Sequence, residues 1–173
     1  NMGTHALLVG MNELSNHDHS RFLTRTNGRV GRLASAGSEA AGEGVNKAVM
    51  MSSVAFQFIW PGMATLYYGD EAGLAGWTDP DNRRTYPWGR EDEELLAFHK
   101  KMIEIRKRYG VLRDGSWRFI YAADGVAAVA RFSDSERIIA VFNSNEKRKT
   151  VTLPLWLSGA DTEGMAATIL KSG

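Results

Sequence analysis

Two short polar clusters carry the side chains best suited to chemistry. The first, at residues 16–21, combines an imidazole, a carboxylate and a guanidinium, and it follows an apolar run at residues 5–11. The second is the acidic pair at residues 70–71, which follows another apolar run at residues 64–68. An imidazole and a carboxylate can hydrogen-bond a polar ligand or bind a metal ion. Because the carboxyl ends of successive parallel strands meet at one edge of a βα array, the pattern predicts a site.

A metal site is one alternative for the first cluster. His17 and His19 flank Asp18, but no further histidine and no cysteine lies nearby to complete a ligand set. The run at residues 79–82 lacks the remaining ligand spacing of a calcium-binding hand. A hydrogen-bonded loop is therefore favoured over a metal centre, and the sequence predicts no metal and no cofactor.

The elements that must position these clusters form an α/β pattern. Residues 5–11 and 64–68 are predicted to be buried strands. Between them, residues 39–60 are predicted to form a largely covered helix with Ser38 as its N-cap. A second helix is predicted at residues 92–109, where apolar side chains recur every three or four positions, acidic residues come first and basic residues come last.

The pattern changes after Gly110 to short apolar runs separated by turn residues. Antiparallel strands are predicted at residues 117–121, 126–132, 137–142 and 150–153. The chain is therefore predicted to be α/β followed by all-β, with a boundary near residues 113–115.

Composition excludes several classes of protein. The 173-residue chain is 43% hydrophobic and 24% charged, which is typical of a soluble globular protein. Its net charge of +1 gives no sign of a nucleic-acid or anionic-membrane partner. The absence of cysteine excludes disulfides and thiolate nucleophiles and is compatible with a reducing, cytoplasmic location. No apolar run approaches the roughly 18 residues of a membrane span.

Three segments together resemble the α-amylase superfamily of glycoside hydrolases, in particular its neopullulanase, cyclomaltodextrinase and α-glucosidase branch. They are the Asn-His-Asp motif at residues 16–18, the segment at 61–71 and the segment at 79–88. The resemblance implies that residues 1–113 are the last two βα units, strands 7 and 8, of a (β/α) eight-fold barrel. It implies that residues 114–173 are an antiparallel β-sandwich C-terminal domain, and that both parts are incomplete.

The resemblance also assigns roles to individual residues. Asp18 matches the aspartate that stabilises the transition state, and His17 matches a histidine that hydrogen-bonds sugar hydroxyls. Asp79 and Arg83 match a pair that reaches the substrate further along the glucan. Glycosidic cleavage passes through an oxocarbenium-like state in which hydrogen bonds to ring hydroxyls strengthen, so a carboxylate that accepts them favours the transition state.

The motifs that carry the family's nucleophile and general acid do not occur in this sequence. Retaining glycosidases need both groups across the scissile bond. We therefore expect the parent to act on an α-glucan or maltooligosaccharide, and this chain alone to be inactive. The alternative is a noncatalytic carbohydrate-binding or oligomerisation module. The motifs fit α-1,4 and α-1,6 linkages equally, and hydrolysis and transfer equally.

Two further expectations concern the surface. Two barrel strands cannot close, so exposed barrel edges predict self-association. Among the tryptophans that might stack on sugar rings, Trp77 is the best candidate because it lies in a polar loop.

Overall fold

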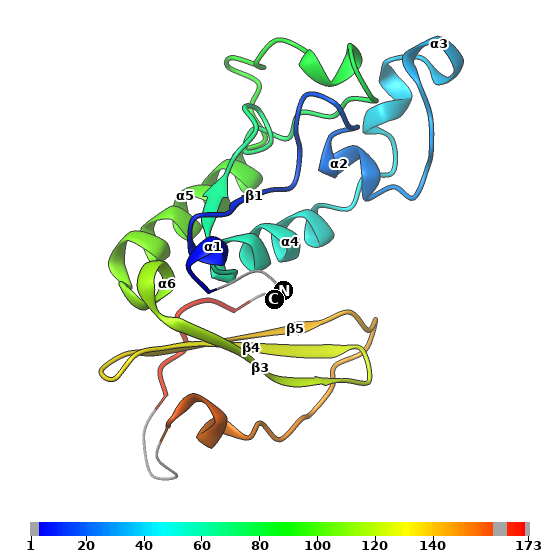
Figure 1. Ribbon diagram of the computed structural model, residues 1–173. Helices are drawn as coiled ribbons and strands as arrows, with labels where there is room; N and C mark the ends of the chain where they lie inside the picture. The colour runs from blue at the N-terminus through cyan, green and yellow to red at the C-terminus, as the bar shows by residue number, and fades with distance from the viewer. Residues whose placement is uncertain (1–3, 161–165, 172–173) are drawn as a thin grey trace. The chain divides into compact units, whose positions relative to one another are not determined.

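The computed structural model describes residues 4–160 and 166–171. The chain divides into two units, Asn1–Asp114 and Gly115–Gly173, and each is described by itself. Figure 1 labels their helices and strands. No helix within the described ranges has the length and apolar character needed to cross a membrane.

The first unit is built around two short parallel strands with a helix between them and another helix after them. Strand β1 pairs with β2 so that Met11 lies opposite Met63 and Glu13 opposite Thr65. The elements of this unit are α1 (Thr4–Leu8), β1 (Met11–Glu13), α2 (Phe22–Arg25), α3 (Leu33–Ala36), the 3₁₀ helix η1 (Glu39–Gly42), α4 (Lys47–Ile59), β2 (Met63–Thr65), η2 (Asp81–Arg83), α5 (Glu93–Arg108) and α6 (Val111–Asp114).

The strand predicted at residues 5–11 is wrong, because most of that run forms helix α1 and β1 begins at Met11. A short apolar run has no periodicity that separates a buried helix from a buried strand. Pairing with β2 fixes where the strand lies, and the buried side chain of Gln57 supports the pair. Its Nε2 donates hydrogen bonds of 2.8 Å to the carbonyl oxygens of Asn12 and Thr65.

The helix predicted at residues 39–60 is shorter than expected and starts later. It is interrupted after η1, where Gly44 has a φ of +64°, a conformation that a helix interior cannot contain. The N-cap of α4 is Asn46, whose side chain accepts a hydrogen bond of 3.1 Å from the backbone N–H of Val49. The predicted cap, Ser38, makes no such bond.

The helix predicted at residues 92–109 is confirmed as α5. Asp92 caps it by accepting a hydrogen bond of 3.1 Å from the backbone N–H of Leu95. Helix α5 lies against α4, as the adjacent ribbons in Figure 1 show, and it carries a stripe of buried side chains. The stripe consists of Leu95, His99, Met102 and Ile105. Burying each large apolar side chain of this kind contributes about 1.5–3 kcal/mol.

The second unit is a three-stranded antiparallel sheet in the order β3-β4-β5. The strands are β3 (Ser116–Ala123), β4 (Val126–Phe132) and β5 (Arg137–Asn143), followed by the 3₁₀ helix η3 (Leu155–Ser158). Asp124 and Gly125 both have positive φ and form the two-residue turn between β3 and β4, as such hairpins require. The first three predicted strands are confirmed. The fourth, at residues 150–153, is wrong because that segment is not in a sheet.

Candidate functional site

The predicted site residues His17 and Asp18 lie in a loop that follows β1 and is stabilised by hydrogen bonds within the loop. Asn16 organises this loop, because its Oδ1 accepts hydrogen bonds from the backbone N–H groups of Asp18 (2.9 Å) and His19 (3.2 Å). The Nδ2 of Asn16 donates to Glu13 at the end of β1. The loop is therefore held in one shape at the carboxyl end of the strand.

His17 and Asp18 point their functional groups into solvent. The imidazole Nε2 of His17 lies 3.4 Å from the Oδ1 of Asp18, and both side chains are more than half exposed. Neither side chain is buried in the protein core. Both can therefore hydrogen-bond a polar ligand.

Asp79 and Arg83, the other two predicted site residues, pair with each other at the start and end of a tight turn. The Nε of Arg83 donates to the Oδ1 of Asp79, and about half of each side chain is exposed. This hydrogen bond is the main cause that raises the pKa of Arg83 above its ordinary value. The negative charge of Asp18 contributes in the same direction.

Asn82 joins the two loops that carry these four residues. Its buried Nδ2 donates to the carbonyl oxygens of Asn16 (3.2 Å) and His19 (2.7 Å). In Figure 1 the segment after β1 runs beside the green segment that contains η2. The structure thus brings together the loop that carries His17 and Asp18 and the loop that carries Asp79 and Arg83, which lie far apart in sequence.

Arg21 is the buried centre beneath the loops. Its Nη1 donates to the carbonyl of Tyr68 (2.7 Å) and to the Oδ1 of Asp70 (2.9 Å), and its Nε donates to the carbonyl of Asn82 (2.9 Å). The guanidinium carbon lies 4.4 Å and 4.9 Å from the ring centroids of Tyr67 and Tyr68. The sequence groups Arg21 with the predicted site without showing that its side chain is buried, and no motif assigned a role to Asn82.

The acidic pair of the second cluster is used by the protein itself. Asp70 is buried and ion-paired to Arg21. Burial raises the pKa of Asp70 by more than the hydrogen bonds from Ser15 and Arg21 lower it. The Oε2 of Glu71 accepts a hydrogen bond from the backbone N–H of Gly69. Asp70 therefore supports the loops rather than facing a ligand.

Trp77 is not a sugar-stacking residue, contrary to the prediction. Its side chain is 2% exposed, and its Nε1 donates to the carbonyl of Gly37. The ring is covered because the loops fold over it, which a local polar sequence cannot reveal. Trp88, at 80% exposed, is the tryptophan of this loop that faces solvent, and its ring packs on Tyr86 with centroids 4.4 Å apart.

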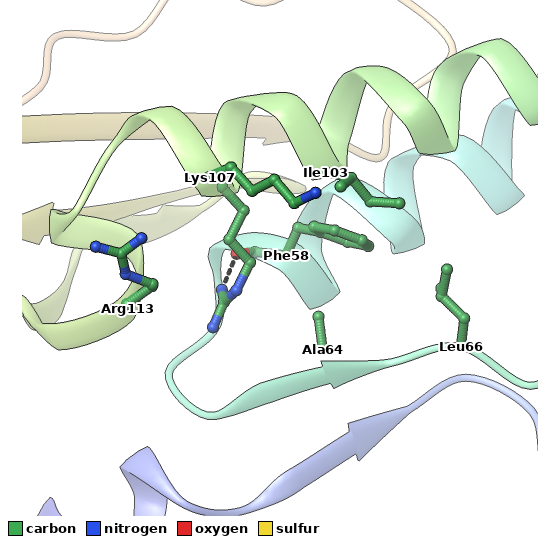
Figure 2. A pocket seen from close by; sticks show the side chains of 7 residues that line it. Phe58, Ala64, Leu66, Ile103, Lys107 and Arg113 are labelled. Atoms are coloured by element: carbon green, nitrogen blue, oxygen red, sulfur yellow. Dashed lines mark hydrogen bonds between the residues drawn. The ribbon is translucent and has the colours of Figure 1, made fainter.

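The loops that carry the four predicted site residues hold no metal-ligand group within the described part of the chain, and one hollow of the first unit lies apart from these loops. Within the described residues, no group of three or more acidic or histidine side chains is arranged to hold a metal ion. A hollow of about 320 Å³ lies elsewhere, between β2 and the side of α5, and Figure 2 shows Ala64 and Leu66 facing Ile103 and Lys107 across it. None of His17, Asp18, Asp79 and Arg83 lines this hollow.

Comparison with known proteins finds relatives named amylopullulanase, neopullulanase and cyclomaltodextrinase. An amylopullulanase from Thermoanaerobacter thermohydrosulfuricus is 35% identical over 175 residues, which span 94% of this chain and 12% of the relative. Neopullulanase 2 from Thermoactinomyces vulgaris is 32% identical over 87% of this chain and 24% of its own length. The solved structure of a cyclomaltodextrinase matches with a TM-score of 0.73 at 32% identity, over 87% of this chain and 24% of that chain.

This chain is homologous to one part of the glycoside hydrolases of the α-amylase family. The resemblance inferred from its motifs is thereby confirmed. No family model matches the chain. The chain spans 12% of the length of the amylopullulanase and 24% of the length of neopullulanase 2.

Proposed function

We propose that residues 1–113 form strands 7 and 8, with their helices, of a (β/α) eight-fold barrel, and that residues 114–173 form part of an antiparallel β-sandwich C-terminal domain. Support comes from the parallel pairing of β1 with β2, with α4 between them and α5 after them. The antiparallel sheet after Gly115 supports the second part of the proposal. The whole protein would be an α-glucan-acting glycoside hydrolase with a retaining mechanism.

Within that enzyme, Asp18 would stabilise the transition state and His17 would hydrogen-bond sugar hydroxyls beside it. Asp79 and Arg83 would bind the glucan further from the scissile bond. The observation that carries this proposal is the bridge made by Asn82, which holds the exposed His17 and Asp18 beside the exposed Asp79–Arg83 pair. Exposed charged and hydrogen-bonding groups of this kind suit the hydroxyls of a maltooligosaccharide.

The chemistry requires two carboxyl groups that this site does not assemble. A retaining glycosidase places its nucleophile and acid roughly 5–5.5 Å apart across the bond. Asp70 is buried against Arg21, and Asp79 is hydrogen-bonded to Arg83. We therefore expect the isolated 173-residue chain to bind sugar without cleaving it.

Self-association is part of the same proposal. Within the described residues, β1 and β2 pair only with each other, so each strand has an unpaired outer edge. Met11 and Met63 lie opposite each other and are both more than half exposed. Pairing of such edges with another copy would cover them. A mass in light scattering that stays monomeric at all concentrations would contradict this part.

Isothermal titration of the purified chain with maltotriose tests the sugar site. We expect binding with a Kd on the order of 1 mM, abolished or strongly weakened by Asp18→Asn and by Arg83→Gln. Asp134→Asn, an exposed change in the second unit, is the matched control and should bind normally. No heat from the unmodified chain at millimolar maltotriose would contradict the proposal.

A parallel assay tests inactivity. We expect no release of nitrophenol from 4-nitrophenyl α-glucoside and no cleavage of maltotriose by the isolated chain. Cleavage by the unmodified chain would overturn the expected inactivity. If that cleavage disappeared in Asp18→Asn, it would still support the role of Asp18.

A further inference from the structure

A single buried amide connects the two loops on which the proposed sugar site depends. The Nδ2 group of Asn82 donates to the carbonyl oxygens of Asn16 and His19, at 3.2 Å and 2.7 Å. These two carbonyls lie immediately before and after His17 and Asp18 in the chain. Asn82 therefore holds both ends of the segment that carries those residues.

The same residue belongs to the second loop. Asn82 lies within η2, directly before Arg83 and three positions after Asp79. A change in the orientation of its side chain would shift one pair of exposed residues relative to the other. We propose that Asn82 is a positioning residue, which sets His17 and Asp18 in register with Asp79 and Arg83; this inference rests on the proposed function of that site.

The orientation of the Asn82 amide follows from its surroundings. Both neighbouring groups are carbonyl acceptors, so the NH₂ end must face them and the oxygen must face away. That oxygen, Oδ1, is buried without a hydrogen-bond partner. An unpaired buried oxygen offsets part of the stability gained from the two bonds. The main effect of the two hydrogen bonds is to fix the position of one loop relative to the other.

Arg21 fixes Asn82 from its other side. The Nε of Arg21 donates to the backbone carbonyl of Asn82 (2.9 Å), while its own backbone N–H donates to the carbonyl of Gly76 (2.9 Å). Arg21 is fully buried and ion-paired to Asp70. The backbone of Asn82 is thus hydrogen-bonded to the buried Arg21. Its side chain is hydrogen-bonded to the exposed loop that carries His17 and Asp18.

The variant that tests the proposal is Asn82→Leu, which keeps a similar volume and removes both donors. The chain offers a closely matched control in Gln57, another buried amide whose Nε2 donates to two carbonyl oxygens and whose Oε1 has no partner. Gln57→Leu removes two equivalent hydrogen bonds, but these bonds join the side chain to strands β1 and β2 and not to the loops. Both variants should lose comparable stability, so a stability change alone does not decide the question.

The deciding measurement is the distance between the loops. The chain has no cysteine, so spin labels can be attached at His19→Cys and Thr85→Cys, both exposed positions on the two loops. We expect a narrow distance distribution by electron paramagnetic resonance in the labelled parent and in Gln57→Leu, and loss of that narrow distribution in Asn82→Leu. An unchanged distribution in Asn82→Leu would overturn the proposal.

A second variant provides a pH-dependent readout. Asn82→Asp has no donor when ionised but one when protonated. The narrow distribution should therefore be partly recovered as the pH is lowered from 7 towards about 5, where a buried carboxyl group carries a proton. A merely structural role would not produce this recovery, and a distribution that is equally broad at both pH values would count against positioning.

Maltotriose titration of the same variants separates this inference from the proposed function. With Asn82→Leu we expect the Kd to rise about tenfold, and with Gln57→Leu we expect little change. Loosened loops with unchanged affinity would overturn the positioning role. If the unmodified chain binds no maltotriose although Asn82→Leu loosens its loops, the proposed function fails while the control of loop geometry by Asn82 is supported.

Discussion

Two ion pairs of similar chemistry serve opposite purposes in this chain. Arg21 and Asp70 are 0% and 4% exposed and lie beneath the loops, whereas Arg83 and Asp79 are 48% and 53% exposed and lie on the loop surface. The buried pair has all its contacts inside the protein, including the rings of Tyr67 and Tyr68. The difference teaches that the buried pair builds the site, while the exposed pair remains available to a ligand.

The largest expected effect comes from breaking the buried pair. Arg21→Met leaves the Asp70 carboxylate buried without its partner, and this should lower the free energy of unfolding by about 3–5 kcal/mol. Urea denaturation followed by circular dichroism at pH 7 measures the change. A loss below about 1 kcal/mol, as for a surface pair, would remove the distinction between the two pairs.

The same variant should show a pH dependence with a definite sign. Burial raises the pKa of Asp70 above its ordinary value of 3.8, and Arg21→Met removes a guanidinium that lowers it. A carboxyl group whose pKa is raised in the folded state contributes stability below its unfolded pKa, and loses that contribution as the pH rises through its folded pKa. The cost of Arg21→Met should therefore be largest near pH 7 and shrink towards pH 4. A cost that does not vary with pH would exclude the charge of Asp70 as its cause.

A partly buried pair should give an intermediate effect. Lys47 Nζ lies 2.5 Å from Asp92 Oδ2, with 43% and 20% of the side chains exposed. Burial alone would raise the pKa of Asp92, but hydrogen bonds from Lys47 and from the backbone N–H of Leu95 lower it below 3.8. Asp92→Asn keeps a good N-cap and removes only the charge, so we expect a loss of about 0.5–1 kcal/mol at pH 7.

The pH dependence of this intermediate pair should have the opposite sign. A lowered pKa gives stability that is present above the unfolded value and is lost as the pH falls through the folded value. The difference between the unmodified chain and Asp92→Asn should thus shrink as the pH falls below the ordinary aspartate pKa of 3.8. Denaturant titrations at a series of pH values check this, and a difference that grows on acidification would contradict the interpretation.

The smallest stability effect is expected at the exposed pair. Asp79→Asn should change the free energy of unfolding by less than about 0.5 kcal/mol, because a solvated ion pair gains little. The same change should weaken maltotriose binding in the titration described above. A variant that is strongly destabilised, with unaltered sugar affinity, would assign Asp79 to the scaffold and invalidate the comparison of the two pairs.

Regular elements with strong local signals could be predicted from sequence. Helix α5 has an apolar stripe, an acidic start and a basic end, and it lies where expected. The turn at Asp124 and Gly125 needs positive φ at both positions, and the strands that flank it also lie where expected. The apolar run at residues 5–11 failed because its length and composition fit either helix or strand, and β1 was decided by pairing with β2.

The residues of the candidate site are a prediction from the sequence, and the structure adds how their loops are connected. The motifs named His17, Asp18, Asp79 and Arg83, and the structure holds their loops together through Asn82. The sugar-binding and catalytic roles of these residues remain predictions. Sequence could not show that Trp77 is covered, because burial depends on which distant loop folds over a side chain.

By itself, the sequence determined the resemblance to the α-amylase family, the helix α5, the hairpin at Gly125 and the identity of the polar residues at the strand ends. These depend on local periodicity, on backbone conformations open to few residues and on motifs within short segments. Only the tertiary structure decided that Arg21 and Asp70 are buried while Arg83 and Asp79 are exposed. Arginine and aspartate have the same chemistry in both pairs, and their solvation is set by the segments that long-range folding places around them.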